Sequence, residues 1–238
     1  MKTRFGKPWN PIVAALFAVG LLAPSAVAQV NMQLTGAGPD NMGGVYVGPY
    51  TALVNGVSTQ VICDDFVDDT YILEKWQATQ TNLLNVTSDA RFGAKTLLYE
   101  RGAWLVLQMS KPANAGESSI GAIQYALWEL FAPSANPLQR LSGTDLEAAQ
   151  SWLGKAQEEG TGVAFTADEL AQFSNFVVYT PIADTASCGG VRCPSAPPQE
   201  FLALKTPESA ALLVLLLDLL ALSGVVLVVR RHVAEVAG

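Results

Sequence analysis

Hydrophobic and polar residues alternate between Val45 and Gln80, where short apolar runs are separated by turn residues. Asn55 and Gly56 lie between two of these runs, and this dipeptide is a strong signal for a β-hairpin. The pattern predicts an antiparallel β section with strands over residues 43–54, 57–67 and 70–80. The glycine-rich stretch at residues 36–44 is expected to be a flexible lead-in to it.

From Asp89 onward, the apolar residues recur with the period of an α-helix. The stop signals are Pro133, which the second helix cannot enter, and Gly160 at the end of the third. Helices are therefore expected over residues 89–109, 118–131, 142–160 and 166–174, with strand-like runs at 175–180 and 200–205. The fold class that follows is α+β, an antiparallel β section followed by a helical section.

The N-terminus has the layout of a secretory signal peptide. Basic residues precede the apolar run "IVAALFAVGLLA", and the small residues Ala26 and Ala28 follow it. We expect residues 1–28 to direct export and to be removed before Gln29.

A second apolar segment lies near the C-terminus, over residues 210–229. About 20 residues at about 1.5 Å each match the thickness of a bilayer, so this segment predicts a transmembrane helix. Its single charge, Asp218, opposes insertion by about 2.5 to 3.5 kcal/mol, which the surrounding Leu and Val residues outweigh. Arg230 and Arg231 should stay in the cytoplasm, which places residues 29–204 outside the inner membrane as one α+β domain.

The formal net charge of the chain is −7. The predicted signal peptide and C-terminal segment contain more basic than acidic residues, so the domain between them is more acidic than the whole chain. An acidic domain argues against nucleic acid as a partner, because phosphates require a basic face.

The three cysteines divide into a pair and a single residue. Cys188 and Cys193 flank the short stretch "GGVR", and exported proteins meet an oxidising environment, so we expect a disulfide between them. Cys63, in "VICDDF", is then an odd thiol. Such a thiol is buried and inert, crosslinked to another chain, or used chemically.

A glutamine in the second predicted helix is a candidate partner for Cys63. Gln124 falls in the middle of an apolar stripe at helical spacing, formed by Ile120, Ile123, Leu127, Trp128 and Phe131. One hypothesis is a buried glutamine whose amide is satisfied by backbone hydrogen bonds. The other is an internal thioester, formed when the Cys63 thiol displaces ammonia from the Gln124 carboxamide.

A thioester places demands on its surroundings. Tyr125 and Trp128 are expected to exclude water from it, because water would hydrolyse the acyl-sulfur bond. One of Asp64 and Asp65 is expected to accept a proton, and the other to be a solvated charge, because adjacent residues of a strand point to opposite faces.

The two motifs together resemble a known family. "VICDDF", followed about sixty positions later by "AIQYALWELF", is similar to the Cys and Gln motifs of the thioester domains of bacterial surface adhesins. The resemblance covers residues 45–131. It implies a β section that carries Cys63, a helical section that carries Gln124, and covalent attachment to amines of a host or matrix.

Residues 205–238 resemble a PEP-CTERM sorting signal, with "KTPES" before the apolar run and "RRH" after it. Pro207 and Glu208 stand in place of the usual Pro-Glu-Pro, and Arg230 and Arg231 form the basic tail. The resemblance implies processing by an exosortase in Gram-negative bacteria that make extracellular polysaccharide. The protein would then be anchored in the inner membrane with a periplasmic domain, or be at the cell surface or outside the cell after processing.

The sequence also contains features that bear on functions other than attachment. "CDDFVDD" supplies several carboxylates that, with Asp40, Asn41 and Glu74, suit a calcium ion, although the usual calcium-loop spacing is absent. The only histidine, His232, lies beyond the predicted membrane segment, so a histidine-based catalytic triad is excluded from the domain. We expect an exported surface protein without a cofactor or enzymatic turnover, and the alternative is a non-covalent structural or calcium-binding surface module.

Overall fold

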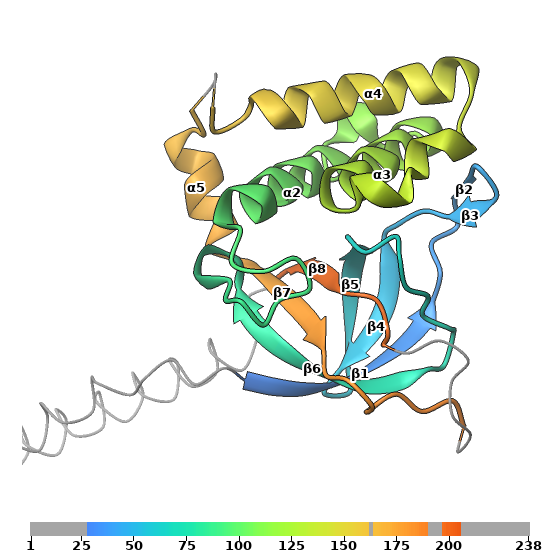
Figure 1. The fold of residues 1–238 in the computed structure, drawn as a ribbon, viewed down its shortest axis with the longest axis vertical. Coiled ribbons are helices and arrows are strands. Elements are labelled where there is room, and N and C mark those ends of the chain that lie inside the picture. The colour runs from blue at the N-terminus through green and yellow to red at the C-terminus, as the bar shows by residue number, and fades with distance from the viewer. Residues whose placement is uncertain (1–27, 162–163, 190–196, 206–238) are drawn as a thin grey trace, which may run out of the picture.

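The structure is a computed structural model, and it describes residues 28–161, 164–189 and 197–205. It consists of a β-barrel with a layer of helices over one end (Figure 1). The strands are β1 (Ala28–Gly36), β2 (Asn41–Met42), β3 (Val45–Tyr46), β4 (Tyr50–Val54), β5 (Val57–Cys63), β6 (Lys75–Asn82), β7 (Phe176–Pro181) and β8 (Phe201–Leu204). The α-helices are α2 (Thr96–Met109), α3 (Glu117–Phe131), α4 (Gly143–Glu158) and α5 (Ala167–Phe173).

The barrel closes in the order β1-β4-β5-β8-β7-β6, and all of its pairings are antiparallel. The short β2 and β3 form a separate two-stranded sheet. Because β7 and β8 follow the helices in sequence, the helical section is inserted between the strands that close the barrel. The α+β fold class predicted from the sequence is confirmed. The closed barrel was not predicted.

The predicted β-hairpin is confirmed at Asn55 and Gly56. Both residues have positive φ, 49° and 84°, as a type I′ turn requires, and the flanking residues Val54 and Val57 pair. Two neighbouring strands are shorter than predicted. The strand after the hairpin ends at Cys63, and the next begins only at Lys75, after Leu73 takes a positive φ of 70° that interrupts extended structure.

The strand β1 was not predicted, and it lies between β4 and β6 in the barrel. Its inward residues Val30, Met32 and Leu34 are buried and alternate with more exposed ones. This alternation is the signal that identifies a strand in the sequence. Of the residues expected to form a flexible lead-in, Gly36 ends β1, and Asn41 and Met42 form β2.

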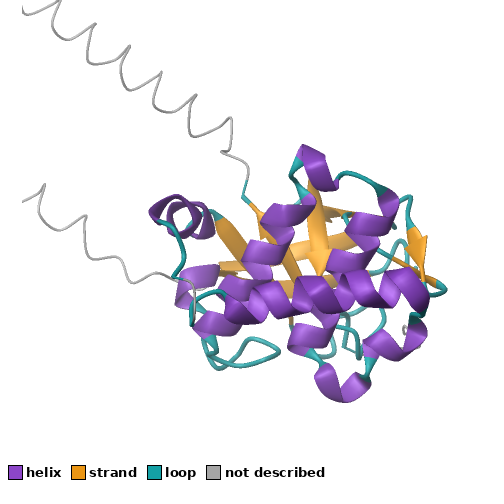
Figure 2. Cartoon of the chain, turned by 90° about the horizontal axis from the view of Figure 1, so that it is seen from above, coloured by secondary structure: helices purple, strands orange, loops and turns teal. Residues whose placement is uncertain are grey.

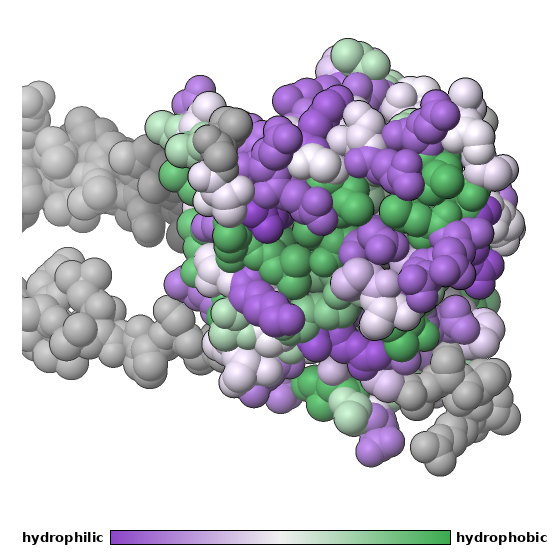
Figure 3. Space-filling model, turned by 45° about the horizontal axis from the view of Figure 1, so that its top comes forward, coloured by the Kyte–Doolittle hydropathy of each residue, from purple (hydrophilic) through white to green (hydrophobic). Residues whose placement is uncertain are grey.

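The helices agree with the sequence pattern except at the start of α2. This helix begins at Thr96, whereas the sequence predicted Asp89, because Gly93 has a positive φ of 76° that a helix cannot contain. The helices lie across one end of the barrel, as the view from above in Figure 2 shows. In α3, which lies between α4 and the barrel (Figure 1), the residues from Ala122 to Trp128 are all buried. Figure 3, in which the helical layer comes forward, shows apolar side chains grouped between polar ones on this face.

Three buried clusters hold these layers together, and one of them packs Met42 of β2 against Tyr125 and Trp128 of α3. The other two involve the barrel strands. The first fills the barrel and includes Met32, Val61, Cys63, Trp76 and Phe201. The second joins the helices to the outside of the barrel through residues such as Ile62, Tyr99 and Leu127. Successive residues of β5 therefore serve different cores, since Ile62 belongs to the second and Cys63 to the first.

Within the residues that the structure describes, no helix has the length and apolar character needed to cross a membrane. The predicted transmembrane helix at residues 210–229 lies outside the described residues. The same holds for the predicted signal peptide, except for Ala28, which is the first residue of β1.

Candidate functional site

The structure brings Cys63 and Gln124 into contact. Cys63 is the last residue of β5 and Gln124 lies in the middle of α3, and both are wholly buried. The Gln124 Nε2 donates a hydrogen bond to the main-chain oxygen of Cys63 at 2.7 Å. Its Oε1 accepts one from the main-chain N–H of Gly48 at 3.3 Å. The contact thus joins the carboxamide to the backbone of Cys63 rather than to its sulfur.

Gly48 makes this approach of the carboxamide possible. A Cβ atom at position 48 would lie 2.8 Å from Gln124 Oε1 and 3.2 Å from Ile62 Cδ1. Any other residue here would push the glutamine away or displace β5. The glutamine therefore joins α3 to the segment that precedes β4 and to the end of β5.

The Cys63 thiol is free, and its Sγ is 3.0 Å from the main-chain oxygen of Asp65, to which it donates. Burial raises the pKa of this thiol well above its usual value, and the neighbouring Asp64 and Asp65 carboxyl groups raise it further. The Trp128 indole N–H faces the sulfur and lowers that pKa, but this effect is smaller than that of burial. The indole nitrogen makes no other hydrogen bond with the described residues.

Tyr125 and Trp128, the two aromatic residues predicted to keep water from the thioester, have different contacts. Trp128 lies one helical turn after Gln124 and packs its ring 5.1 Å from that of Tyr125, measured between centroids. The Tyr125 hydroxyl donates to the main-chain oxygen of Met42 at 3.0 Å. Tyr125 therefore anchors β2 to α3, and Trp128 is the aromatic residue that reaches the thiol.

The expectation that one of the two aspartates would be a solvated charge is wrong. Asp64 and Asp65 are both wholly buried. Asp65 lies 3.2 Å from Arg91 in an ion pair and accepts the main-chain N–H of Val67 at 2.9 Å. Arg91 also pairs with Asp68, so one guanidinium compensates two carboxylates of this loop.

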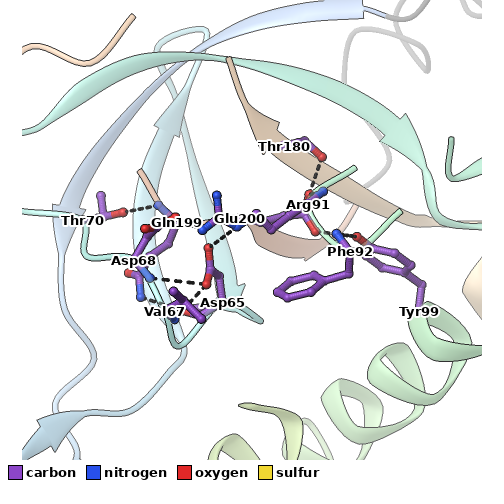
Figure 4. Close-up of polar contacts among 11 residues, drawn as sticks. Asp65, Val67, Asp68, Thr70, Arg91, Phe92, Tyr99, Thr180, Gln199 and Glu200 are labelled. Atoms are coloured by element: carbon purple, nitrogen blue, oxygen red, sulfur yellow. Dashed lines mark hydrogen bonds and ion pairs between the residues drawn. The ribbon is translucent and has the colours of Figure 1, made fainter. Parts of the chain in front are cut away.

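Asp64 has a different partner, Glu200, which the sequence did not single out. Cys63 pairs with Phe201 across β5 and β8, so in this antiparallel register the next residue on one side, Asp64, lies opposite Glu200. Glu200 accepts hydrogen bonds from the Tyr99 hydroxyl at 2.6 Å, the Arg91 N–H at 2.8 Å and the Thr180 hydroxyl (Figure 4). The sequence offered one indication of Glu200, an acidic residue directly before the apolar run "FLAL". The strand register that places it opposite Asp64 cannot be read from the sequence.

The two carboxyl groups of Asp64 and Glu200 share a wholly buried environment. Burial raises the pKa of Asp64 well above its usual value, and the charges of Glu200 and Asp65 add to this effect. The pKa of Glu200 is also raised by burial, although its three hydrogen-bond donors oppose the shift. Asp64 is buried without a cation beside it among the described residues, and its side-chain hydrogen-bond partner is the Glu200 carboxyl group.

A pocket of about 420 Å³ is lined by Trp128, whose indole N–H faces the thiol. Tyr50 and Phe201 also line it, and Phe201 is the strand partner of Cys63. Its outer part includes the exposed rings of Tyr46 and Tyr71, which are 59% and 42% exposed. The pocket therefore extends from these exposed rings to the buried Trp128 side chain.

The described residues contain no group of three or more His, Cys, Asp or Glu side chains that could hold a metal ion. Glu74, one of the residues considered for calcium, is buried and accepts the main-chain N–H of Tyr71 at 2.7 Å. Asp65 and Asp68 of "CDDFVDD" pair with Arg91, and Asp64 lies beside Glu200, so these three carboxyl groups do not converge on one point.

Cys188 is disulfide-bonded, in keeping with the predicted use of this cysteine, while Cys193 lies outside the described residues. The predicted sorting residues Pro207, Glu208, Arg230 and Arg231 lie outside them as well.

Comparisons with known proteins do not assign the chain to a class. No protein-family model, no curated protein and no solved structure matches it.

Proposed function

We propose that the protein is an exported surface protein that attaches covalently to amines through an internal thioester between Cys63 and Gln124. The observation that supports this proposal is the contact between a free buried thiol residue and a buried carboxamide residue, which are 61 positions apart in the chain. Folding thus holds the two reacting residues together, and such confinement can replace a very high concentration of reactants.

The reaction joins Cys63 Sγ to the side-chain carbon of Gln124 and breaks the bond from that carbon to Nε2. The thiol proton and the amide nitrogen leave together as ammonia. Because Cys63 points into the barrel while Gln124 holds its main-chain oxygen, the step requires rotation of both side chains. An amine that later attacks the thioester forms an amide with Gln124 and restores the Cys63 thiol.

The surroundings suit a bond that must survive in water and still be reached by a partner. Trp128, which is 3% exposed, and Tyr50 separate the thiol from the solvent-filled pocket. An amine on a slender chain can follow this pocket to the aromatic residues that cover the sulfur. Its entry then requires only a local movement of side chains.

Intact-mass measurement of the purified protein tests the proposal. A thioester lowers the mass by about 17 Da, the mass of ammonia, and methylamine should then add to the protein at Gln124. Cys63→Ala and Gln124→Glu are matched controls, because neither can lose ammonia by this route. A full sequence mass after allowance for the disulfide, with no methylamine adduct, would contradict the thioester.

A second candidate is a non-covalent structural surface module. The observation in its favour is that the Gln124 carboxamide already satisfies both a donor and an acceptor of the barrel backbone. Under this candidate, Gln124→Ala lowers the free energy of unfolding by about 1 to 3 kcal/mol, because it leaves the Gly48 N–H and the Cys63 oxygen buried without partners. Urea unfolding measures this change, and an undiminished sequence mass of the wild type separates the two candidates.

Anchoring and sorting complete the proposed function. We propose residues 1–28 as a signal peptide, residues 29–204 as the domain outside the inner membrane, and residues 205–238 as a segment recognised by an exosortase-type enzyme. Membrane fractionation of cells that produce the full chain or residues 1–204 tests this part. The full chain should sediment with membranes or reach the surface in processed form, and the shorter chain should be released into the soluble periplasmic fraction.

A further inference from the structure

A second pocket lies between the helical layer and the outside of the barrel, and it is mainly apolar. Its volume is about 500 Å³, which is within the range of pockets that bind small ligands. Its walls include Val106, Leu107 and Met109 of α2, Ile120 of α3, Ile62 of β5 and Leu204 of β8. Among the residues that the structure describes, no charged side chain lines it. An apolar ligand could therefore enter without leaving a charge unpaired.

This apolar pocket is the open edge of the cluster that joins the helices to the barrel. Ile62, Leu107 and Met109 belong to that cluster and are buried. Toward the solvent, Val106 and Ile120 are only partly buried, and Leu204 is 45% exposed. Grouped apolar side chains that remain accessible to water are stabilised when a partner covers them.

The polar groups of the pocket are neutral. Ser58, Thr59 and Gln60 of β5 and Ser110 after α2 line it together with the apolar residues. Ser58, Gln60 and Ser110 are exposed, so they form a hydroxyl and amide rim around the apolar part. An anionic ligand would require a cation or converging N–H donors, and the lining offers no cation. The ligand that matches this lining has a long apolar part and a neutral polar part, as the acyl chain and ester group of a phospholipid do.

The chain leaves the domain at this pocket. Leu204 is the last residue of β8, and the N–H of Lys205, where the described chain ends, donates to the main-chain oxygen of Asn175 at 2.7 Å. Only residues 206–209 separate Lys205 from the apolar segment 210–229, for which the sequence predicts a membrane anchor. A fully extended chain spans at most about 17 Å over this length. An anchor at residues 210–229 therefore keeps the mouth of the pocket close to the membrane surface.

We propose that the apolar pocket is a lipid-binding site, which takes an acyl chain of the membrane in which residues 210–229 are anchored. The inference rests on the proposed anchor and adds a second contact between the domain and the bilayer. Binding removes the apolar surface of Leu204, Ile120 and Val106 from water, and the short connection keeps lipid at a high effective concentration. A domain held at one point can turn, whereas two contacts fix its orientation on the membrane.

Photo-crosslinking of the full chain in phospholipid vesicles tests the site. The vesicles contain phosphatidylcholine with a diazirine in its acyl chain, and mass spectrometry of peptides identifies the labelled residues. The wild type should be labelled at Met109, Ile120 or Leu204 as well as within residues 210–229. Leu204→Asp should lower the labelling of Met109 and Ile120 by about 10-fold or more, because a carboxylate at the mouth would have to be buried against the acyl chain.

Leu170→Asp is the matched control, because Leu170 is 42% exposed and does not line the pocket. It should be labelled as the wild type is, and circular dichroism should show both variants folded. If lipid labels residues 210–229 of the wild type but not the pocket, or if Leu204→Asp folds and labels equally, the lipid site is overturned while the anchor stands. If lipid labels neither region of the wild type, the anchor fails and this inference fails with it.

Discussion

At the scale of single residues, the contact between Cys63 and Gln124 depends on the absence of a side chain at Gly48. Gly48 lies where Gln124 and Ile62 leave no space for a Cβ atom. The sequence predicted that Cys63 and Gln124 would be neighbours, because each belonged to a recognisable motif. It did not predict that Gln124 would hold the Cys63 backbone, because side-chain orientation depends on Gly48 and on the strand register.

Gly48→Ala should lower the free energy of unfolding by about 1 to 3 kcal/mol, the range for overpacking a filled site. The new methyl group would be only 2.8 Å from Gln124 Oε1, so the carboxamide must leave the Gly48 N–H. Urea unfolding followed by circular dichroism measures the effect. Gly154→Ala, within α4 and with nothing near its added methyl, should instead stabilise the protein by about 0.5 to 1 kcal/mol. Equal behaviour of the two variants would refute this account.

At the scale of elements, sequence patterns identified the helices better than the barrel. Helices α3 and α4 were predicted nearly to their ends because hydrogen bonding and capping within a helix are local. Barrel closure depends on pairings between distant segments, such as β1 with β6 and β5 with β8, and no local signal records them. Glu200 was missed for the same reason, since its importance comes only from its position opposite Asp64.

The role of β1 predicts a large difference between its two faces. Met32 is 2% exposed and fills the barrel, whereas Gln29 is exposed on the same strand. Met32→Ala should cost about 2 to 5 kcal/mol of unfolding free energy, as expected for a cavity in a packed core. Gln29→Ala should change it by less than about 0.5 kcal/mol. Thermal unfolding of the two variants measures this contrast, and a harmless Met32→Ala would mean that β1 does not close the barrel.

At the scale of the whole molecule, buried carboxyl groups should make stability depend on pH in an unusual direction. In Asp64 and Glu200 the pKa is raised in the folded state, because burial disfavours the charged form. The folded protein therefore holds protons that the unfolded chain releases above about pH 4. Their contribution to stability is complete below that pH and is lost as the pH rises through the folded-state pKa values.

The protein should accordingly be more stable near pH 5 than near pH 8. Asp64→Asn should flatten this dependence and stabilise the protein at pH 8 by about 1 to 3 kcal/mol, because no buried charge has to form. Chemical unfolding at a series of pH values, with Asp89→Asn as the exposed control, measures both effects. If the free energy of unfolding of the wild type rises steadily from pH 5 to pH 8, groups other than Asp64 and Glu200 control its pH dependence.

The position of β8 between β5 and β7 has a consequence for timing. Phe201, the strand partner of Cys63, and Glu200, the partner of Asp64, both belong to the end of the described chain. During synthesis, the thiol and the carboxamide are made well before the segment that completes their enclosure. The surroundings of Cys63 can therefore be completed only after β8 has been synthesised. Cys63 reaches its final environment only after β8 has joined the barrel. Under the proposed function, a thioester formed in that environment would show that the domain had folded.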